Sequence, residues 1–231
     1  MSILYGGLFG AGEAARLFSD GAEIRAMLVA EGALAQVQGR LGVIPETAAQ
    51  AIHRASLAIT LDPAALAGPT SQNGVPVPGL VAAFRAAMGA PEHAQFVHWG
   101  ATSQDIQDTG LMLRLRQALA EAEAQARATA QALARLAEAH AELPMASRTY
   151  GQVATPTSFG AVAAGWGWPL LDLLDEVEAL RKASLWVSLS GAAGTGAALG
   201  PRAAETRARL AEALGLNDPG RSWHADRGPV L

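Results

Sequence analysis

The segment that decides the fold is HWGATSQDIQDT, residues 98–109, which leads directly into a long alanine-rich stretch. From Leu115 to Leu143 the apolar positions alternate steps of four and three residues, as in a heptad pattern. The pattern predicts a helix of roughly 40 residues, or about 60 Å. A helix of that length is too long for a small domain to cover. The sequence therefore predicts a bundle of long helices, shared between subunits.

A second polar segment, SRTYGQVATPTSFG, occupies residues 147–160. Pro144 precedes it and is predicted to end the first long helix. The apolar and small residues that follow predict a second long helix over residues 157–189. No strand is predicted, because no segment alternates apolar and polar residues convincingly. The two polar segments thus lie at the ends of long helices.

Shorter helical patterns precede the first polar segment. Residues 1–18 are predicted to be irregular because they are rich in glycine. Ser19 or Asp20 is predicted to cap a helix that Gly42 ends. The run of hydroxyl and amide residues at 70–74, in a region broken by prolines and glycines, predicts a polar loop. Together these patterns indicate a small helical domain.

Composition excludes several classes of protein. Of the 231 residues 50% are hydrophobic, 16% are charged, and the net charge is -4. The 17 Lys and Arg residues are scattered, which argues against a nucleic-acid or anionic-membrane partner. The chain has no cysteine and no His/Glu motif with metal-ligand spacing, so no metal site is predicted. With no secretory signal and no membrane span in the pattern, we predict a cytoplasmic protein.

The first polar segment offers groups for proton transfer and for anion binding. A histidine such as His98 can move a proton near neutral pH. Thr102 and Ser103, with the backbone N–H groups around them, can bind a carboxylate. Alternatively, Ser103, Gln104 or Asp105 caps the long helix. The two interpretations are compatible, because a helix N-terminus favours both a cap and an anion.

The second polar segment contains Arg148, Thr149, Tyr150 and Gln152. An arginine can bind a carboxylate through two parallel hydrogen bonds, so Arg148 is a candidate for substrate binding. The alternative is a polar connection between helices, whose side chains only satisfy backbone groups. Spacing alone does not separate these interpretations.

Together the quoted segments resemble the fumarase/aspartase superfamily, and most closely its bacterial 3-carboxy-cis,cis-muconate cycloisomerase branch. Residues 98–109, followed by LMLRLR, resemble the first signature of that branch. RTYGQVATPTSFG resembles the second signature of the superfamily, usually RTHxQxAxPxTxG. The opening LFSDGAEIRAMLVAEGALAQVQGRLGVIP, residues 17–45, also resembles the start of the branch.

The resemblance implies an all-α fold with a small helical N-terminal domain over residues 1–103. A long-helix bundle of the fumarase/aspartase type is expected over residues 104–231. It further implies a homotetramer with a core of 20 helices, with active sites where segments of different subunits meet. It implies no metal and no organic cofactor.

The implied reaction closes 3-carboxy-cis,cis-muconate, a small tricarboxylate, to γ-carboxymuconolactone during protocatechuate breakdown to β-ketoadipate. Its intermediate is a carbanion stabilised as an aci-carboxylate, which requires carboxylate clamps and a proton donor. By position, Thr102 and Ser103 are expected to bind one substrate carboxylate. Thr149 and Gln152 are expected to bind another part of the substrate. His98 and Tyr150 are the candidate catalytic residues.

Two departures from the superfamily pattern qualify this expectation. Tyr150 stands where the second signature usually has its general-acid histidine, which argues against a lyase of the adenylosuccinate or argininosuccinate type. The third signature, GSSxMPxKxN, is absent from the 231 residues, so about half of a usual family member is expected to be missing. Two alternatives follow: a β-elimination lyase of fumarate-forming substrates, and a helical assembly fragment that does not complete an active site.

Overall fold

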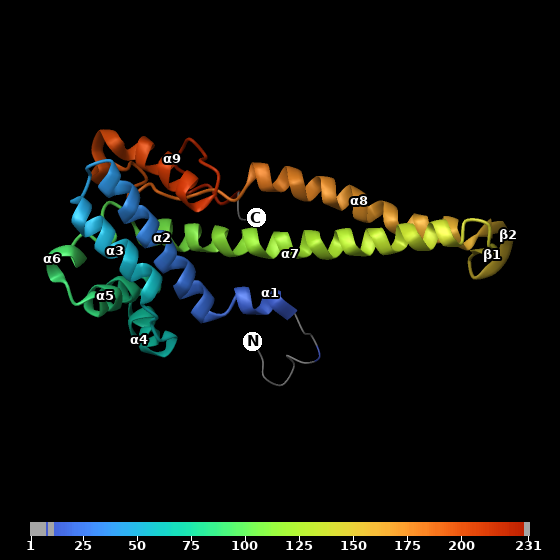
Figure 1. Ribbon diagram of the computed structural model, residues 1–231, viewed down its shortest axis with the longest axis horizontal. Helices are drawn as coiled ribbons and strands as arrows, with labels where there is room; N and C mark the ends of the chain where they lie inside the picture. The colour runs from blue at the N-terminus through green and yellow to red at the C-terminus, as the bar shows by residue number, and fades with distance from the viewer. Residues whose placement is uncertain (1–7, 9–11, 229–231) are drawn as a thin grey trace. The chain divides into compact units, whose positions relative to one another are not determined.

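The computed structural model describes Leu8 and residues 12–228, and it confirms the all-α prediction (Figure 1). Within these residues no helix is long and apolar enough to cross a membrane. The elements in chain order are α1 (Gly12–Leu17), α2 (Asp20–Arg40), α3 (Glu46–Ala58), α4 (Pro63–Asn73), α5 (Val77–Met88), α6 (Pro91–Ala94), α7 (Ser103–Ala139), β1 (Pro144–Thr149), β2 (Gln152–Ser158), α8 (Phe159–Ala183), the 3-10 helix η1 (Ala197–Arg202) and α9 (Ala203–Leu214).

The chain divides into two compact units. The first unit contains residues 1–117 and 184–231, and the second contains residues 118–183. Helix α7 begins in the first unit and ends in the second. Each unit is described by itself below.

Helix α2 is the central element of the first unit and lies beside α3 and α9 (Figure 1). Ser19 caps it by accepting a hydrogen bond from the backbone N–H of Ala22, as predicted. Two glycines allow α3 to approach closely: a side chain at Gly32 would overlap Ser56, and one at Gly39 would overlap Ala49. The core around these helices consists of fully buried apolar side chains. They include Met27, Leu28, Leu34, Ile52, Leu80, Phe84, Ile106, Met112, Leu210 and Trp223.

Two predictions for the N-terminal part are wrong. The run at 70–73 belongs to helix α4, because its polar side chains bond back to the preceding turn instead of forming a loop. Thr70 Oγ1 donates to the carbonyl of Leu66 at 2.7 Å, and Asn73 Nδ2 donates to that of Pro69 at 2.8 Å. Gly74 then ends the helix with a positive φ. Residues 12–17 form the helix α1, although residues 1–18 were predicted to be irregular; the rest of that segment, apart from Leu8 and Phe18, lies outside the described residues.

The second unit contains a β-hairpin, so the prediction that the chain has no strand is wrong. Strands β1 and β2 pair antiparallel, with Thr149 opposite Gln152 and an irregularity between Ala146 and Arg148. Tyr150 and Gly151 form the turn, and both have a positive φ, as a type I′ turn requires. Sequence patterns usually reveal such turns through Asn-Gly or Asp-Gly, and Tyr-Gly gives no such signal.

Helix α8 runs antiparallel to the part of α7 that belongs to the second unit (Figure 1). Gly160 permits close contact, because a side chain there would overlap Ala137 in the last turn of α7 and Ala141 just after it. Arg181 pairs with Glu123 across the two helices at 3.2 Å. The helix is shorter than the predicted 157–189, since residues 184–190 leave it to join the first unit.

Replacing Gly39 by valine is expected to lower the free energy of unfolding by about 1–3 kcal/mol, because the side chain overpacks the α2–α3 contact. Gly21→Ala in the same helix is the matched control, since a Cβ there meets nothing within 4 Å. The control is expected to change stability by less than about 1 kcal/mol. Urea unfolding followed by circular dichroism measures both, and equal effects would contradict the close-contact account.

Candidate active site

The first turn of α7 is organised around the buried carboxylate of Asp105, which is 0% exposed. Its Oδ1 accepts hydrogen bonds from Ser188 Oγ and the backbone N–H of Ser190, both at 2.9 Å. Its Oδ2 accepts from the backbone N–H groups of Gly191 at 2.9 Å and Thr102 at 3.0 Å. Asp105 therefore caps its own helix, as one of the sequence interpretations proposed, and also fixes a segment that lies far away in the chain.

One turn further along α7, Asp108 binds a segment near the end of the described chain. Arg227 donates to both of its carboxylate oxygens, at 2.7 and 2.8 Å, and Gln104 Nε2 donates to Oδ1 at 2.8 Å. The hydrogen bond to Asp108 raises the pKa of Arg227 above its ordinary value. The same guanidinium lies over the ring of buried Trp223, 5.2 Å from its centroid. Because the pairing is bidentate, it fixes the orientation of the guanidinium relative to the carboxylate in addition to its electrostatic attraction.

The glycine-rich loop at residues 190–196 packs against the first polar segment. A side chain at Gly100 would overlap Leu199, and one at Gly191 would approach the carbonyl oxygen of Gly100 to 3.4 Å. The hydroxyl of Thr109 accepts from the backbone N–H of Ser188 at 3.0 Å. Gly100 thus leaves room for the Leu199 side chain, and Gly191 adopts a φ of 71°, a conformation that favours glycine.

Thr102 and Ser103 lie at the start of α7 and His98 lies in the turn before it, all within the first unit. His98 has a φ of 65°, and its Nδ1 lies 2.6 Å from Oε1 of Glu31, whose side chain is 0% exposed. The hydroxyls of Thr102 and Ser103 bond to no other residue in the described part of the chain, and both residues are half-buried. Hydroxyls without a protein partner at a helix N-terminus can bind an anion.

Arg148, Thr149, Tyr150 and Gln152 lie at the tip of the hairpin in the second unit. Tyr150 is fully exposed, with a φ of 47°. Arg148 is exposed and donates from Nη1 to the carbonyl of Gly151 at 3.4 Å. The structure thus gathers the predicted residues into two groups, one in each unit.

Sequence reasoning missed the side chains that hold the first group in place. Glu31 and Gln38 are buried within α2, and Arg227 lies in a segment of loop composition. The available signal was the position of Glu31 and Gln38 on the apolar face of a helical pattern. Nothing in the pattern indicated a partner for Arg227. Among the described residues, no group of three or more His, Cys, Asp or Glu side chains could hold a metal ion.

The fold and the two polar segments define a family. The chain matches the model of the lyase family over residues 13–226 and belongs to that family. This confirms the resemblance to the fumarase/aspartase superfamily.

Individual members of the family are also similar to this chain. The chain is 41% identical to a 3-carboxy-cis,cis-muconate cycloisomerase of Pseudomonas aeruginosa, over 99% of this chain and 50% of the relative. It is 42% identical to a nitrosuccinate lyase of Streptomyces davaonensis, over 92% of this chain and 47% of that protein. The crystal structure of a 3-carboxy-cis,cis-muconate lactonizing enzyme from Pseudomonas putida matches with a TM-score of 0.94 and 37% identity, over 99% of this chain and 52% of that one. The chain therefore spans about half the length of these relatives.

Replacing Asp105 by asparagine is expected to lower the free energy of unfolding by about 3 kcal/mol. The amide cannot accept all four hydrogen bonds, and its NH₂ group faces backbone donors. Asp62→Asn is the matched control, because Asp62 is an exposed helix cap and asparagine caps equally well. Urea unfolding of both variants measures the difference. A loss of less than about 1 kcal/mol for Asp105→Asn would show that the carboxylate is not the anchor.

Proposed function

We propose that the chain is part of an enzyme that closes 3-carboxy-cis,cis-muconate to γ-carboxymuconolactone. One observation carries the proposal. His98 lies five residues before Ser103, the first residue of α7, and the hydroxyls of Thr102 and Ser103 bond to no described residue, in a segment that resembles the first signature of the cycloisomerase branch. A polyanionic substrate suits this site, because the helix dipole and the hydroxyls both favour negative charge.

The reaction forms one C–O bond and one C–H bond. A carboxylate oxygen of the substrate attacks a carbon of the diene, and the displaced π electrons move toward a second carboxylate as an aci-carboxylate. A proton from the site then completes the C–H bond, so that one proton is taken up in each turnover. Groups that bind the second carboxylate stabilise the intermediate, and a positioned acid supplies the proton.

The proposed roles follow this chemistry. Thr102 and Ser103 bind one substrate carboxylate, and His98 exchanges the proton. In the second group, Arg148, Thr149 and Gln152 bind another part of the substrate, and Tyr150 donates a hydrogen bond or a proton. No metal or organic cofactor enters this scheme.

A second candidate is a β-elimination lyase that forms fumarate. The similarity to the nitrosuccinate lyase supports it, because the sequence identity to that lyase is 42% and the sequence identity to the cycloisomerase relative is 41%. The two reactions share a carbanion next to a carboxylate, but the lyase expels a group from the neighbouring carbon, whereas the cycloisomerase adds a carboxylate oxygen to it. Tyr150, in place of the general-acid histidine, favours the cycloisomerase.

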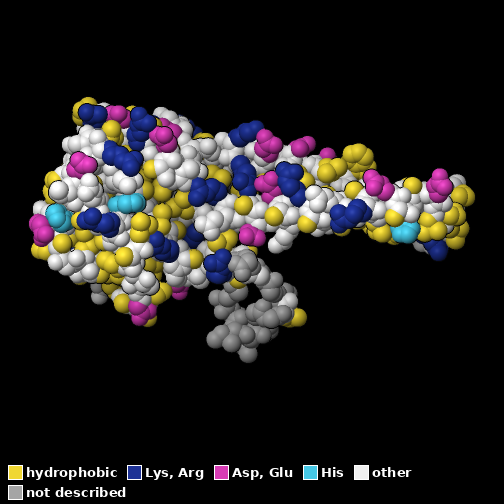
Figure 2. Space-filling view, viewed as in Figure 1, with side chains coloured by type: hydrophobic (Ala, Val, Ile, Leu, Met, Phe, Trp, Pro, Cys, Tyr) yellow, Lys and Arg dark blue, Asp and Glu magenta, His cyan; other side chains and the backbone are white. Residues whose placement is uncertain are grey.

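We also propose that the protein works as a cytoplasmic homotetramer on the β-ketoadipate route, with no nucleic-acid or membrane partner. The division into an N-terminal domain at 1–103 and a bundle at 104–231 remains part of this proposal. Apolar side chains exposed within the second unit, where Figure 2 shows hydrophobic groups over the hairpin, support assembly with other copies. They are Leu143, Val153, Trp166, Trp168, Leu171, Leu173 and Leu180.

Adding 3-carboxy-cis,cis-muconate to the protein and following its ultraviolet absorbance tests the proposed activity. We expect the diene absorbance to fall and chromatography to show the lactone. Release of fumarate from a substituted succinate, with the muconate left unchanged, would favour the lyase. Substrate binding without any turnover would favour the helical assembly fragment.

Ser103→Ala is expected to weaken binding of the tricarboxylate about tenfold or more, because a hydrogen bond to a charged group is lost. The KM for the tricarboxylate in the absorbance assay measures the change, because the parent is expected to convert this ligand during a titration. Ser71→Ala, at an exposed position of α4, is the control and is expected to bind as the parent does. Equal affinities for the two variants would remove Ser103 from the site.

A further inference from the structure

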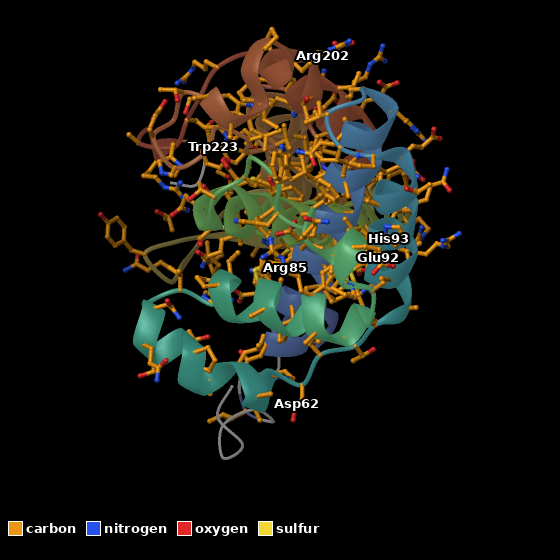
Figure 3. All side chains as sticks on the ribbon, turned by 90° about the vertical axis from the view of Figure 1, so that its left-hand side faces the viewer. Asp62, Arg85, Glu92, His93, Arg202 and Trp223 are labelled. Carbon is orange, nitrogen blue, oxygen red and sulfur yellow. The ribbon has the colours of Figure 1, made fainter. Side chains whose placement is uncertain are left out.

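The backbone on either side of His98 is held by two side chains from different helices. Arg85 of α5 (Figure 3) donates from Nη2 to the carbonyl of Val97 at 2.7 Å. Gln38 of α2, which is 0% exposed, donates from Nε2 to the carbonyl of Trp99 at 2.7 Å. These carbonyls belong to the residues immediately before and after the histidine. The segment is therefore held by side chains of α5 and α2 in addition to the hydrogen bonds of its own turns.

His98 itself is held in an unfavourable conformation. Its φ of 65° lies in the left-handed region, which a residue with a side chain rarely adopts. Such strain persists only where surrounding contacts determine the conformation, and it is concentrated at functional sites. Here the contacts are the two backbone hydrogen bonds and the side-chain pair between His98 and Glu31.

The pair between His98 and Glu31 is asymmetric. The Glu31 side chain is 0% exposed, whereas that of His98 keeps 18% of its surface. Glu31 Oε1 lies 2.6 Å from His98 Nδ1, while Glu31 Oε2 is buried and hydrogen-bonded to no described residue. A buried pair that serves stability alone needs all its polar atoms satisfied, because an unsatisfied one is costly. The single contact points to a role in orienting the imidazole.

A carboxylate accepts hydrogen bonds and has no proton to donate, so the short contact assigns the proton of the neutral imidazole to Nδ1. The other ring nitrogen, Nε2, then carries a lone pair. No described residue forms a hydrogen bond with it, and the His98 side chain keeps 18% of its surface exposed. This is the arrangement in which a histidine can take up or deliver a proton at one defined atom.

We propose that Glu31 is a positioning residue that holds His98 in the Nδ1–H form, so that Nε2 exchanges the proton of the reaction. The proposal deepens the proposed function and rests on it for the identity of that reaction. Glu31 acts through His98 and does not touch the substrate. Its place on α2, about two helical turns from Gln38, puts the support on the most buried helix of the unit.

The test is Glu31→Gln in the 231-residue chain, with nitrogen-15 NMR of the histidine rings. The His98 signals are assigned by their loss in His98→Gln. In the parent we expect Nδ1 protonated and Nε2 unprotonated. In Glu31→Gln we expect a mixture or the opposite form, because the amide can either donate to Nδ1 or accept from it. Glu23→Gln, the same change elsewhere on α2 at a side chain 37% exposed, is the control and should match the parent.

A second measurement is the rate at which diethyl pyrocarbonate modifies His98, mapped by mass spectrometry. The reagent attacks an unprotonated ring nitrogen, so Glu31→Gln should slow modification about threefold or more, and Glu23→Gln should not. In the turnover assay, Glu31→Gln should lower kcat about tenfold or more while KM stays within about twofold.

A parent His98 protonated on Nε2 would overturn the proposal whether or not the variant folds. An unchanged ring form in folded Glu31→Gln would overturn it too, as would an unchanged kcat. The ring readouts need no turnover. Failure of the muconate assay with the expected ring form would therefore count against the proposed function and leave the role of Glu31 standing.

Discussion

The carboxylate of Asp105 is the constraint on which the rest of the first unit depends. It is fully buried and accepts four hydrogen bonds, three of them from backbone N–H groups. A buried charge is tolerated only when it is satisfied in this way. Asp105 thus caps the N-terminus of the longest helix and binds the loop at residues 188–191, which follows α8 in the chain.

Asp108, one helical turn after Asp105, also binds a segment of the chain that is remote in sequence. Its bidentate pair with Arg227 brings the segment after α9 onto α7, where Trp223 donates from its ring N–H to the carbonyl of Val187 at 2.9 Å. Two remote segments of the chain, residues 187–191 and 223–227, therefore meet at the first turns of one helix. On the remaining side, Glu31 holds His98. His98, the proposed proton-exchanging group of the first unit, lies in a segment that buried polar contacts have already fixed, as preorganised catalysis requires.

Much of this architecture could be predicted from the sequence. The capping residue Ser19 predicted the start of α2, and the regular spacing of apolar residues after Leu115 predicted α7. Both are local signals that a sequence shows directly. His98, Thr102 and Ser103 were singled out by their residue types and by the resemblance of one short segment, and their roles stay predictions. The hairpin was missed because Tyr150 adopts a positive φ, which is rare for tyrosine, so the sequence gives no turn signal there. Glu31 was missed because a glutamate in a helix is ordinarily solvent-exposed, and only the fold reveals which face is buried.

Amide hydrogen exchange at Ser190 and Gly191 tests most directly whether Asp105 anchors the loop to α7. The exposed neighbours Ala192 and Ala193 provide the internal reference. If the carboxylate holds the loop, the amides of Ser190 and Gly191 exchange only by global unfolding, and Asp105→Asn brings their rates close to those of the two alanines. Rapid exchange of both amides in the parent protein would contradict the anchor and the preorganised site built upon it.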